Sequence, residues 1–206
     1  MKDFLVFTDI LENIAIIIAS LSAVYGGSKG WEVYRKKKQN DLIVEVLEYF
    51  YRARDALRRI RNPFLYVGEG GTRERRETES EQEKEIYDRV YVPMERYKKE
   101  EAIFQKLESL KYKFIANFGK ESAEPFTKLF NALNKIFLAS NILRTAWIQQ
   151  GRRFPSDEAF QDHLERMHKY EGIFWEGAED PDKFGQEIEA TIDEIEVISE
   201  KLMKKI

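Results

Sequence analysis

The sequence predicts an all-α protein in which an N-terminal transmembrane helix precedes an antiparallel bundle of four long helices and one short helix. One uncharged apolar run lies near the N-terminus and is followed by a block of cations. Beyond it, apolar residues recur every three or four positions over five segments, which is the period of an amphipathic helix. No segment alternates apolar and polar residues for long enough to require a strand.

The first predicted element is a membrane anchor at residues 14–25, which read IAIIIASLSAVY. Residues 13–28 carry no charge and would make about 24 Å of helix. A hydrocarbon core is roughly 30 Å thick, and residues 10–31 are long enough to cross it. Glu12 and Lys29 then lie just inside the two ends, where a charge costs far less than at mid-bilayer.

Two other interpretations of this run remain open. An in-plane helix or a buried core helix can be equally short, but residues 14–25 are apolar on all sides and a core helix does not require a cationic block. A cleaved signal peptide normally begins with net positive charge. The first 13 residues here contain one lysine and three acids.

Aromatic and basic residues after the run predict its orientation. Trp and Tyr collect at membrane interfaces, and cations mark the cytoplasmic side. We therefore expect a single-pass protein of the cell membrane with its N-terminus outside, a tail and anchor at 1–34, and a cytoplasmic helical-bundle domain at 35–206. The expected membrane-interface anchors are Trp31, Tyr34, Arg35, Lys36, Lys37 and Lys38.

Five helices are expected in the cytoplasmic part. Their ranges are about 41–61, 78–118, 125–151, 157–171 and 182–205. Asn40 or Asp41 is a suitable cap for the first helix, although the preceding RKKKQN contains no glycine or proline that would separate it from the anchor. Short connections between such helices predict antiparallel neighbours.

Prolines modify two of these helices. Pro93 lies inside the second apolar pattern and predicts a kink or break near Tyr91 and Val92. Asp180 followed by Pro181 is a typical start for the last helix, with the aspartate as its cap.

Composition excludes several functions. The chain carries 34 Lys and Arg against 37 Asp and Glu, a net charge of −3, so it lacks the basic surface of a general nucleic-acid binder. It contains no cysteine, which removes disulfides, thiol catalysis, thiolate zinc sites and iron–sulfur clusters. No cofactor is expected.

The longest irregular segment, 62–80, is glycine-rich and flanked by arginines. Backbone amides and guanidiniums there could hold a phosphate or an acidic lipid headgroup, but the phosphate-loop lysine is missing, and interleaved glutamates favour a solvated loop. The candidate anion or headgroup contacts are Arg58, Arg59, Arg61, Arg73, Arg75 and Arg76. Arg54 lies closest to the apolar stripe, and we expect it to pair with a buried carboxylate.

Other polar groups show no pattern of catalysis. Residues 174–182, FWEGAEDPD, contain four carboxylates, but their spacing matches no calcium loop, and a connection between helices is the simpler interpretation. His163 and His168 are five positions apart and do not share a helical face. No catalytic or metal-binding residue is predicted, and an enzyme is the least favoured class.

The layout resembles that of bacterial single-pass membrane proteins with a helical cytoplasmic domain, a group with no assigned activity. The resemblance is carried by IIIASLSAVYGGSKGWEVYRKKK, RNPF…GEGGTR and FWEGAEDPD. It implies a membrane-anchored architecture and no particular mechanism.

Three functional hypotheses follow. The first is a membrane-anchored interaction or regulatory module that contacts lipid and either a protein partner or a second copy of itself. The second is a small oligomeric membrane effector or channel subunit, suggested by Asp9, Glu12 and Asn13 on one side of the outer end of the anchor. The third is a ligand-binding or enzymatic domain that uses segments 62–80 and 174–182.

Overall fold

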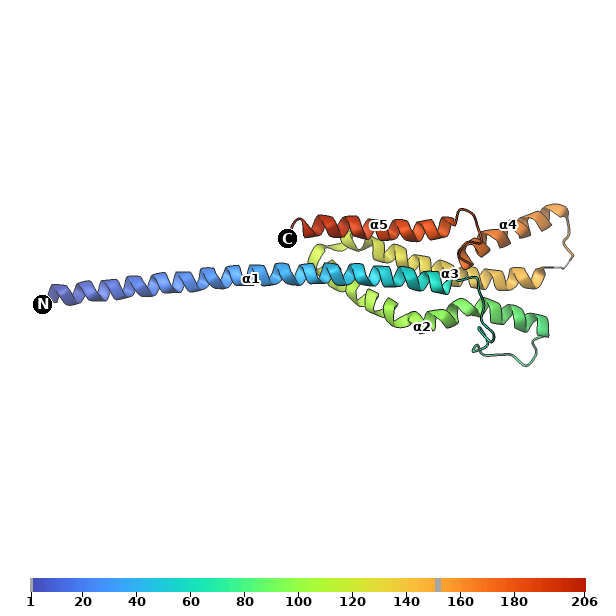
Figure 1. Ribbon diagram of the computed structural model, residues 1–206, viewed down its shortest axis with the longest axis horizontal. Helices are drawn as coiled ribbons and strands as arrows, with labels where there is room; N and C mark the ends of the chain where they lie inside the picture. The colour runs from blue at the N-terminus through green and yellow to red at the C-terminus, as the bar shows by residue number, and fades with distance from the viewer. Residues whose placement is uncertain (1, 151–152) are drawn as a thin grey trace. The chain divides into compact units, whose positions relative to one another are not determined.

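The computed structural model describes the backbone of residues 2–150 and 153–206, together with their side chains except those of residues 2–15, 21 and 23–26. The described chain consists of five α-helices and one short 3-10 helix, without strands (Figure 1). The all-α prediction is therefore confirmed. The elements are α1 (Lys2–Ile60), α2 (Glu81–Phe118), η1 (Lys120–Ala123), α3 (Glu124–Gln149), α4 (Asp157–Phe174) and α5 (Lys183–Met203).

The chain divides into two compact units, one ending at Leu42 and the other formed by Ile43–Lys205. The predicted anchor belongs to the first unit. Among the residues described there, Ile16, Ile17 and Ile18 are each more than half exposed. These three successive side chains place apolar surface around α1 and not on one stripe of it.

No helix in the part of the chain whose side chains are described is both long enough and apolar enough to cross a membrane. About half of the predicted anchor, residues 14, 15, 21 and 23–25, lies outside those residues. The same is true of the side chains of Asp9, Glu12 and Asn13, on which the channel hypothesis depends.

The predicted interface residues all lie on α1. The rings of Trp31 and Tyr34 are in contact, with centroids 5.8 Å apart, and Lys36 pairs with Glu32 at 3.2 Å. The helix continues through residues 35–40 without a break, so neither Asn40 nor Asp41 is a helix cap.

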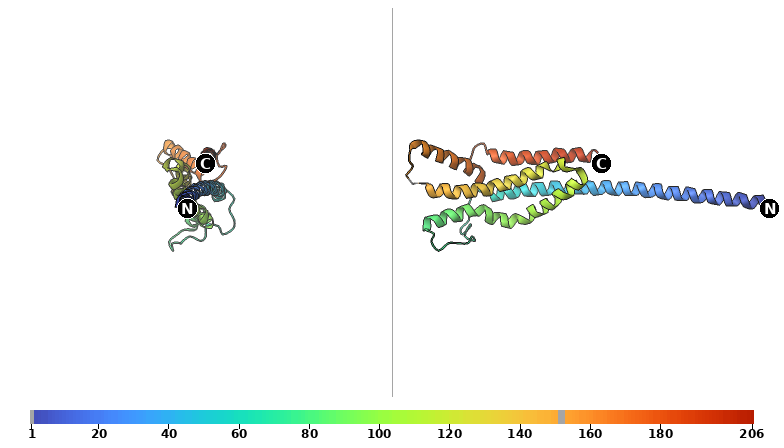
Figure 2. Two further views of the ribbon diagram at one scale, coloured as in Figure 1. Left: turned by 90° about the vertical axis from the view of Figure 1, so that its left-hand side faces the viewer. Right: turned by 180° about the vertical axis from the view of Figure 1, so that it is seen from behind.

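In the second unit, neighbouring helices run antiparallel. Figures 1 and 2 show α2 returning along the part of α1 that starts at Ile43, and α3 returning along α2. Two successive helices, α4 and α5, together occupy the fourth position of the bundle. The carboxyl-terminal half of α3 contacts α4, where Trp147 bonds to Glu171, and its amino-terminal half contacts α5, where Lys135 bonds to Glu187.

Aromatic residues fill the bundle core. Phe50 of α1, Phe114 of α2 and Phe126 of α3 are completely buried. Phe126 contacts both other rings, with centroid distances of 4.8 and 5.6 Å. At the other end of α3, Trp147 meets Phe174 edge to face at 5.6 Å, an arrangement that aromatic quadrupoles favour.

Of the kink or break predicted near Tyr91 and Val92, the break does not occur. α2 passes through Pro93 and curves along its length (Figures 1 and 2). A proline inside a helix costs about 3 kcal/mol because it removes one backbone hydrogen bond and crowds the preceding turn. The burial of Val90, Val92 and Phe104 on either side of it offsets that cost.

One helix boundary also differs from the prediction. The cap of α5 is Asp182, whose Oδ1 accepts from the backbone nitrogen of Gly185 at 2.8 Å, and not Asp180. The helix starts later because Asp182 is also bonded to Arg61. α3 ends at Gln149, and the end predicted at Gly151 lies outside the described residues.

Candidate functional site

Arg61, which directly follows α1, has the largest fully buried side chain in the described chain, with 1% of its surface exposed. Its guanidinium donates to the carbonyls of Gly172 and Ile173 at 2.9 Å and of Trp175 at 3.2 Å, and it pairs with Asp182 at 3.0 Å. The last carbonyls of a helix lack intrahelical partners and attract a cation. Arg61 therefore completes the end of α4.

The same arginine organises the connection at 174–182. The backbone nitrogen of Glu176 donates to the carbonyl of Arg61 at 2.8 Å, and the guanidinium lies 4.9 Å from the centre of the Phe184 ring. Burial acts to raise the pKa of Asp182, but hydrogen bonds from Arg61 and from a backbone amide outweigh it and keep this pKa below its ordinary value. The carboxylate is thus a structural counterion.

A second buried arginine, Arg96 of α2, holds the start of the 62–80 segment. It pairs with Glu69 at 2.7 Å, and both side chains are less than 10% exposed. It also donates to the carbonyls of Asn62 and Phe64, at 2.5 and 2.6 Å, and to that of Ile60 at 3.4 Å. Arg96 therefore donates to carbonyls at the end of α1, as Arg61 does at the end of α4.

The middle of the segment is attached to α2 by a close backbone approach. The backbone nitrogen of Gly70 and the hydroxyl of Thr72 both donate to Glu95, at 2.9 and 2.8 Å. Gly70 has φ +84, and a Cβ at this position would lie 1.9 Å from the carbonyl oxygen of Asp88. Only glycine fits here, because both the backbone angle and the available space exclude a side chain.

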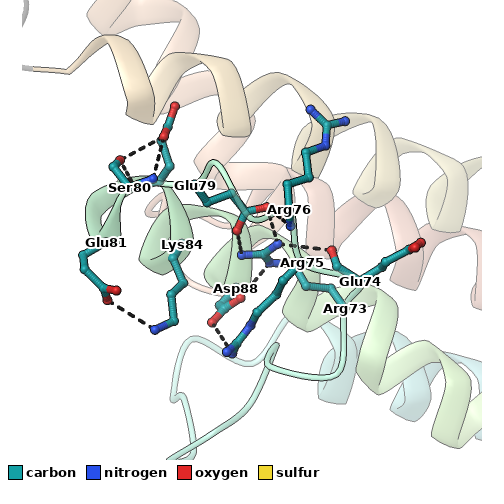
Figure 3. A network of polar contacts seen from close by, with 10 residues as sticks. Arg73, Glu74, Arg75, Arg76, Glu79, Ser80, Glu81, Lys84 and Asp88 are labelled. Carbon is teal, nitrogen blue, oxygen red and sulfur yellow. Dashed lines mark hydrogen bonds and ion pairs between the residues drawn. The ribbon is translucent and has the colours of Figure 1, made fainter.

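A compact ion-pair network follows in the same segment (Figure 3). Arg73 pairs with Glu79 at 2.5 Å and with Asp88 at 2.7 Å, and its side chain is only 9% exposed. Arg75 reaches Asp88 at 3.2 Å. In the close view, the side chain of Arg76 extends away from this network. Two ion pairs therefore compensate the charge of Arg73, whereas Arg76 makes no ion pair within the described residues.

The six candidate anion contacts do not form one site. Arg58 pairs with Glu189 of α5 at 3.0 Å, and Arg59 binds Glu100 of α2 with two hydrogen bonds. Arg61 is buried, and Arg73 and Arg75 are engaged with carboxylates. Of the six, Arg76 alone makes no ion pair within the described residues.

The expectation for Arg54 was wrong. Its partners are Asp55 at 3.0 Å and Glu189 at 3.8 Å, and both carboxylates are at least 40% exposed. Within the described residues, Arg73 and Arg96 pair with carboxylates that are less than 10% exposed, those of Glu79 and Glu69. Arg96 was missed, although it follows Val92 and Pro93 by four and three positions and so lies on the buried stripe of α2.

The tip of the 62–80 segment is apolar and exposed. The exposed fractions are 76% for Phe64, 43% for Leu65, 72% for Tyr66 and 108% for Val67. Its backbone is nevertheless held, because Asn62 accepts from the backbone nitrogen of Phe64 and Glu69 accepts from that of Tyr66. These four residues, called the FLYV tip below, present an apolar surface on an ordered backbone.

A cavity of about 760 Å³ lies between α2 and α3, beside the ion-pair network. Apolar, hydroxyl, amide and charged side chains all line it. The lining residues are Arg73, Glu74, Arg76, Glu79, Tyr87, Val90, Tyr91, Met94, Phe137, Ser140, Asn141, Arg144, Thr145, Ile148 and Gln149. Sequence reasoning identified Arg73 and Arg76 but not Arg144, which is 68 positions after Arg76 and comes near it only through packing.

The histidines lie elsewhere, on α4. His168 is exposed and lies 3.7 Å from Glu171, and the ring of His163 contacts Phe154. In the described part of the chain, no group of three or more His, Asp or Glu side chains is placed to hold a metal ion.

Comparisons of the chain with protein-family models, with curated proteins and with solved structures returned no match.

Proposed function

We propose that this protein is a membrane-anchored interaction module: the N-terminal part of α1 holds the chain at a bilayer, and the FLYV tip docks a protein partner. The observation that carries the proposal is the exposure of four successive apolar side chains on an ordered loop. Contiguous exposed apolar residues are typical of interaction sites. A backbone held before binding reduces the entropy lost on association.

A photocrosslinking amino acid placed at Tyr66 of the full-length chain in native membranes tests the docking. Tyr112 of α2 is the matched control because it is a tyrosine of similar exposure, 65% against 72%. We expect a discrete crosslinked species from position 66 and none from position 112. Phe64→Ser in the same chain should abolish it, because it removes apolar contact area from the tip.

Equal crosslinking from positions 66 and 112, or a species unaffected by Phe64→Ser, would contradict docking through the tip. A crosslinked species twice the mass of the chain would identify the partner as a second copy.

The anchor is proposed at residues 10–31, with the N-terminus outside and the bundle in the cytoplasm. Three features support it: the uncharged run, the exposed Ile16, Ile17 and Ile18, and the Trp31 and Tyr34 pair before the basic block. These are the signs of a span that ends at a cytoplasmic interface.

Single cysteines test this topology without background, because the natural chain contains none. In intact cells, an impermeant maleimide should label Thr8→Cys but not Glu121→Cys, and both should be labelled after lysis. Release of the chain from membranes by alkaline carbonate would refute the anchor, and labelling of Glu121→Cys in intact cells would refute the orientation.

A further inference from the structure

The cavity between α2 and α3 has the size of a small-molecule site. Its volume of about 760 Å³ falls within the range of roughly 300–1,000 Å³ that is common for such pockets. The segment 73–79 contributes to its wall, and the Arg73–Glu79–Asp88 network orders that segment. The wall therefore does not need a ligand in order to form.

The lining of the cavity combines apolar and polar side chains. Val90 and Met94 of α2 and Phe137 and Ile148 of α3 supply apolar area. Hydroxyl and amide groups on the same stripe of α3 complete the lining. These are Ser140, Asn141, Thr145 and Gln149.

The charges of the lining are unequally compensated. Arg73 and Glu79 neutralise each other. Arg76 extends away from that pair (Figure 3), and Arg144 has no ion pair within the described residues. One acidic residue of the lining, Glu74, also makes no ion pair within the described residues. The cavity thus offers two available guanidiniums and one repelling carboxylate.

We propose that this cavity binds an organic anion, a molecule with one carboxylate, sulfonate or phosphate group on an aromatic or aliphatic body. Arg76 and Arg144 bind the anionic group, because guanidiniums match the geometry of such oxyanions. Val90, Met94 and Phe137 contact the body, which gains free energy by leaving water. This site is separate from the FLYV tip and does not depend on the proposed docking.

The test uses Ser140→Cys in the full-length chain, held in discs of neutral lipid. Its thiol would be the only one in the chain, so the rate at which a maleimide modifies it reports occupancy of this cavity alone. The probe is 8-anilinonaphthalene-1-sulfonate, and its control is N-phenyl-1-naphthylamine, which has the same aromatic body without the charge. Glu121→Cys, on η1, controls for effects outside the cavity.

The sulfonate should slow modification of the cysteine at position 140, and the effect should saturate. The neutral amine should give equal protection only at an about tenfold higher concentration. This factor corresponds to about 1.4 kcal/mol. Arg144→Gln should raise the half-protecting concentration of the sulfonate about tenfold. Arg144→Lys should raise it less, because lysine keeps the charge but loses the guanidinium geometry. Glu74→Gln should lower it. Modification at position 121 should not change.

Equal protection by the charged and neutral probes, or protection unchanged by both Arg144→Gln and Arg76→Gln, would overturn the proposal. Arg144 is exposed and makes no ion pair with the residues that the structure describes, so its replacement should not prevent folding, and an unchanged thermal melt verifies this. Protection in discs that contain phosphatidylglycerol, without added probe, would support the same site with a lipid headgroup as the anion. Protection only by added sulfonate would support a soluble anion.

Discussion

Arg61 and Asp182 are 121 residues apart in sequence, yet Nη2 of the arginine lies 3.0 Å from Oδ1 of the aspartate. The contact joins the residue after α1 to the cap of α5. Since Arg61 also completes the end of α4, a single side chain connects three helix ends.

Arg61→Met should therefore destabilise the protein strongly. Removal of one partner from a buried ion pair costs about 3–5 kcal/mol, because the other charge and the carbonyls lose their partner. Chemical denaturation of the full chain measures this. Arg52→Met on the same helix is the control, because Arg52 and its partner Glu48 are both about half exposed and such pairs contribute roughly 0.3–0.5 kcal/mol. Similar losses in the two variants would disprove the central role of Arg61.

Gly70→Ala should be much more destabilising than Gly68→Ala. Both glycines have positive φ in the same loop, +84 and +81, so both variants incur backbone strain of about 1–2 kcal/mol. Only at Gly70 would the new Cβ also collide with the carbonyl of Asp88, whereas around Gly68 nothing lies within 4 Å. Thermal unfolding of the two variants separates strain from collision. Equal melting temperatures would show that the loop does not depend on its close approach to α2.

Acid should weaken the attachment of the 62–80 segment. The hydrogen bonds from Arg96 hold the pKa of Glu69 below its ordinary value of 4.5, against the effect of burial. A carboxylate with a lowered folded-state pKa stabilises the protein fully above the unfolded-state pKa, and this stabilisation disappears as the pH falls through the folded-state pKa. The free energy of unfolding should therefore decline below about pH 4.5, and in Glu69→Gln this decline should be smaller. An identical pH profile in the variant would count against the pair.

Glu69→Gln should also loosen the FLYV tip while the bundle stays folded. Glu69 binds Arg96 and the backbone nitrogen of Tyr66, so its loss releases the loop more than the core. We expect limited chymotrypsin digestion next to Phe64 and Tyr66 to accelerate about tenfold, which corresponds to about 1.4 kcal/mol of easier opening. Glu77→Gln, on an exposed residue of the same loop, should digest at the wild-type rate. Faster digestion of both variants would trace the effect to lost charge alone.

Much of the fold was predictable because helices are encoded locally. The three- and four-residue spacing of Ile43, Val46 and Phe50 predicted a buried stripe, and all three side chains are fully buried. Ser80 and Glu83 form a capping box at the start of α2, next to the predicted start at residue 78. A predicted helix boundary was wrong where a distant residue binds the capping residue, as Arg61 binds Asp182.

The candidate site was less predictable for the same reason. The sequence drew attention to arginines close together along the chain, but Arg58 and Arg59 lie on different sides of a helix and bind Glu189 and Glu100, on different helices. Arg144 joins Arg76 at the cavity only because α3 packs beside the segment that precedes α2.

The sequence by itself determined the helical class, the five amphipathic segments and the lack of thiol chemistry, since periodicity and composition are properties of neighbouring residues. Tertiary structure alone decided which arginines are neutralised and which remain available. The pairings of Arg58 with Glu189 and of Arg61 with Asp182 depend on carboxylates far along the chain, and the energy of a charge depends on the distance and burial of its partners. Neither the distance to a partner nor its burial can be read from a residue's position in the sequence.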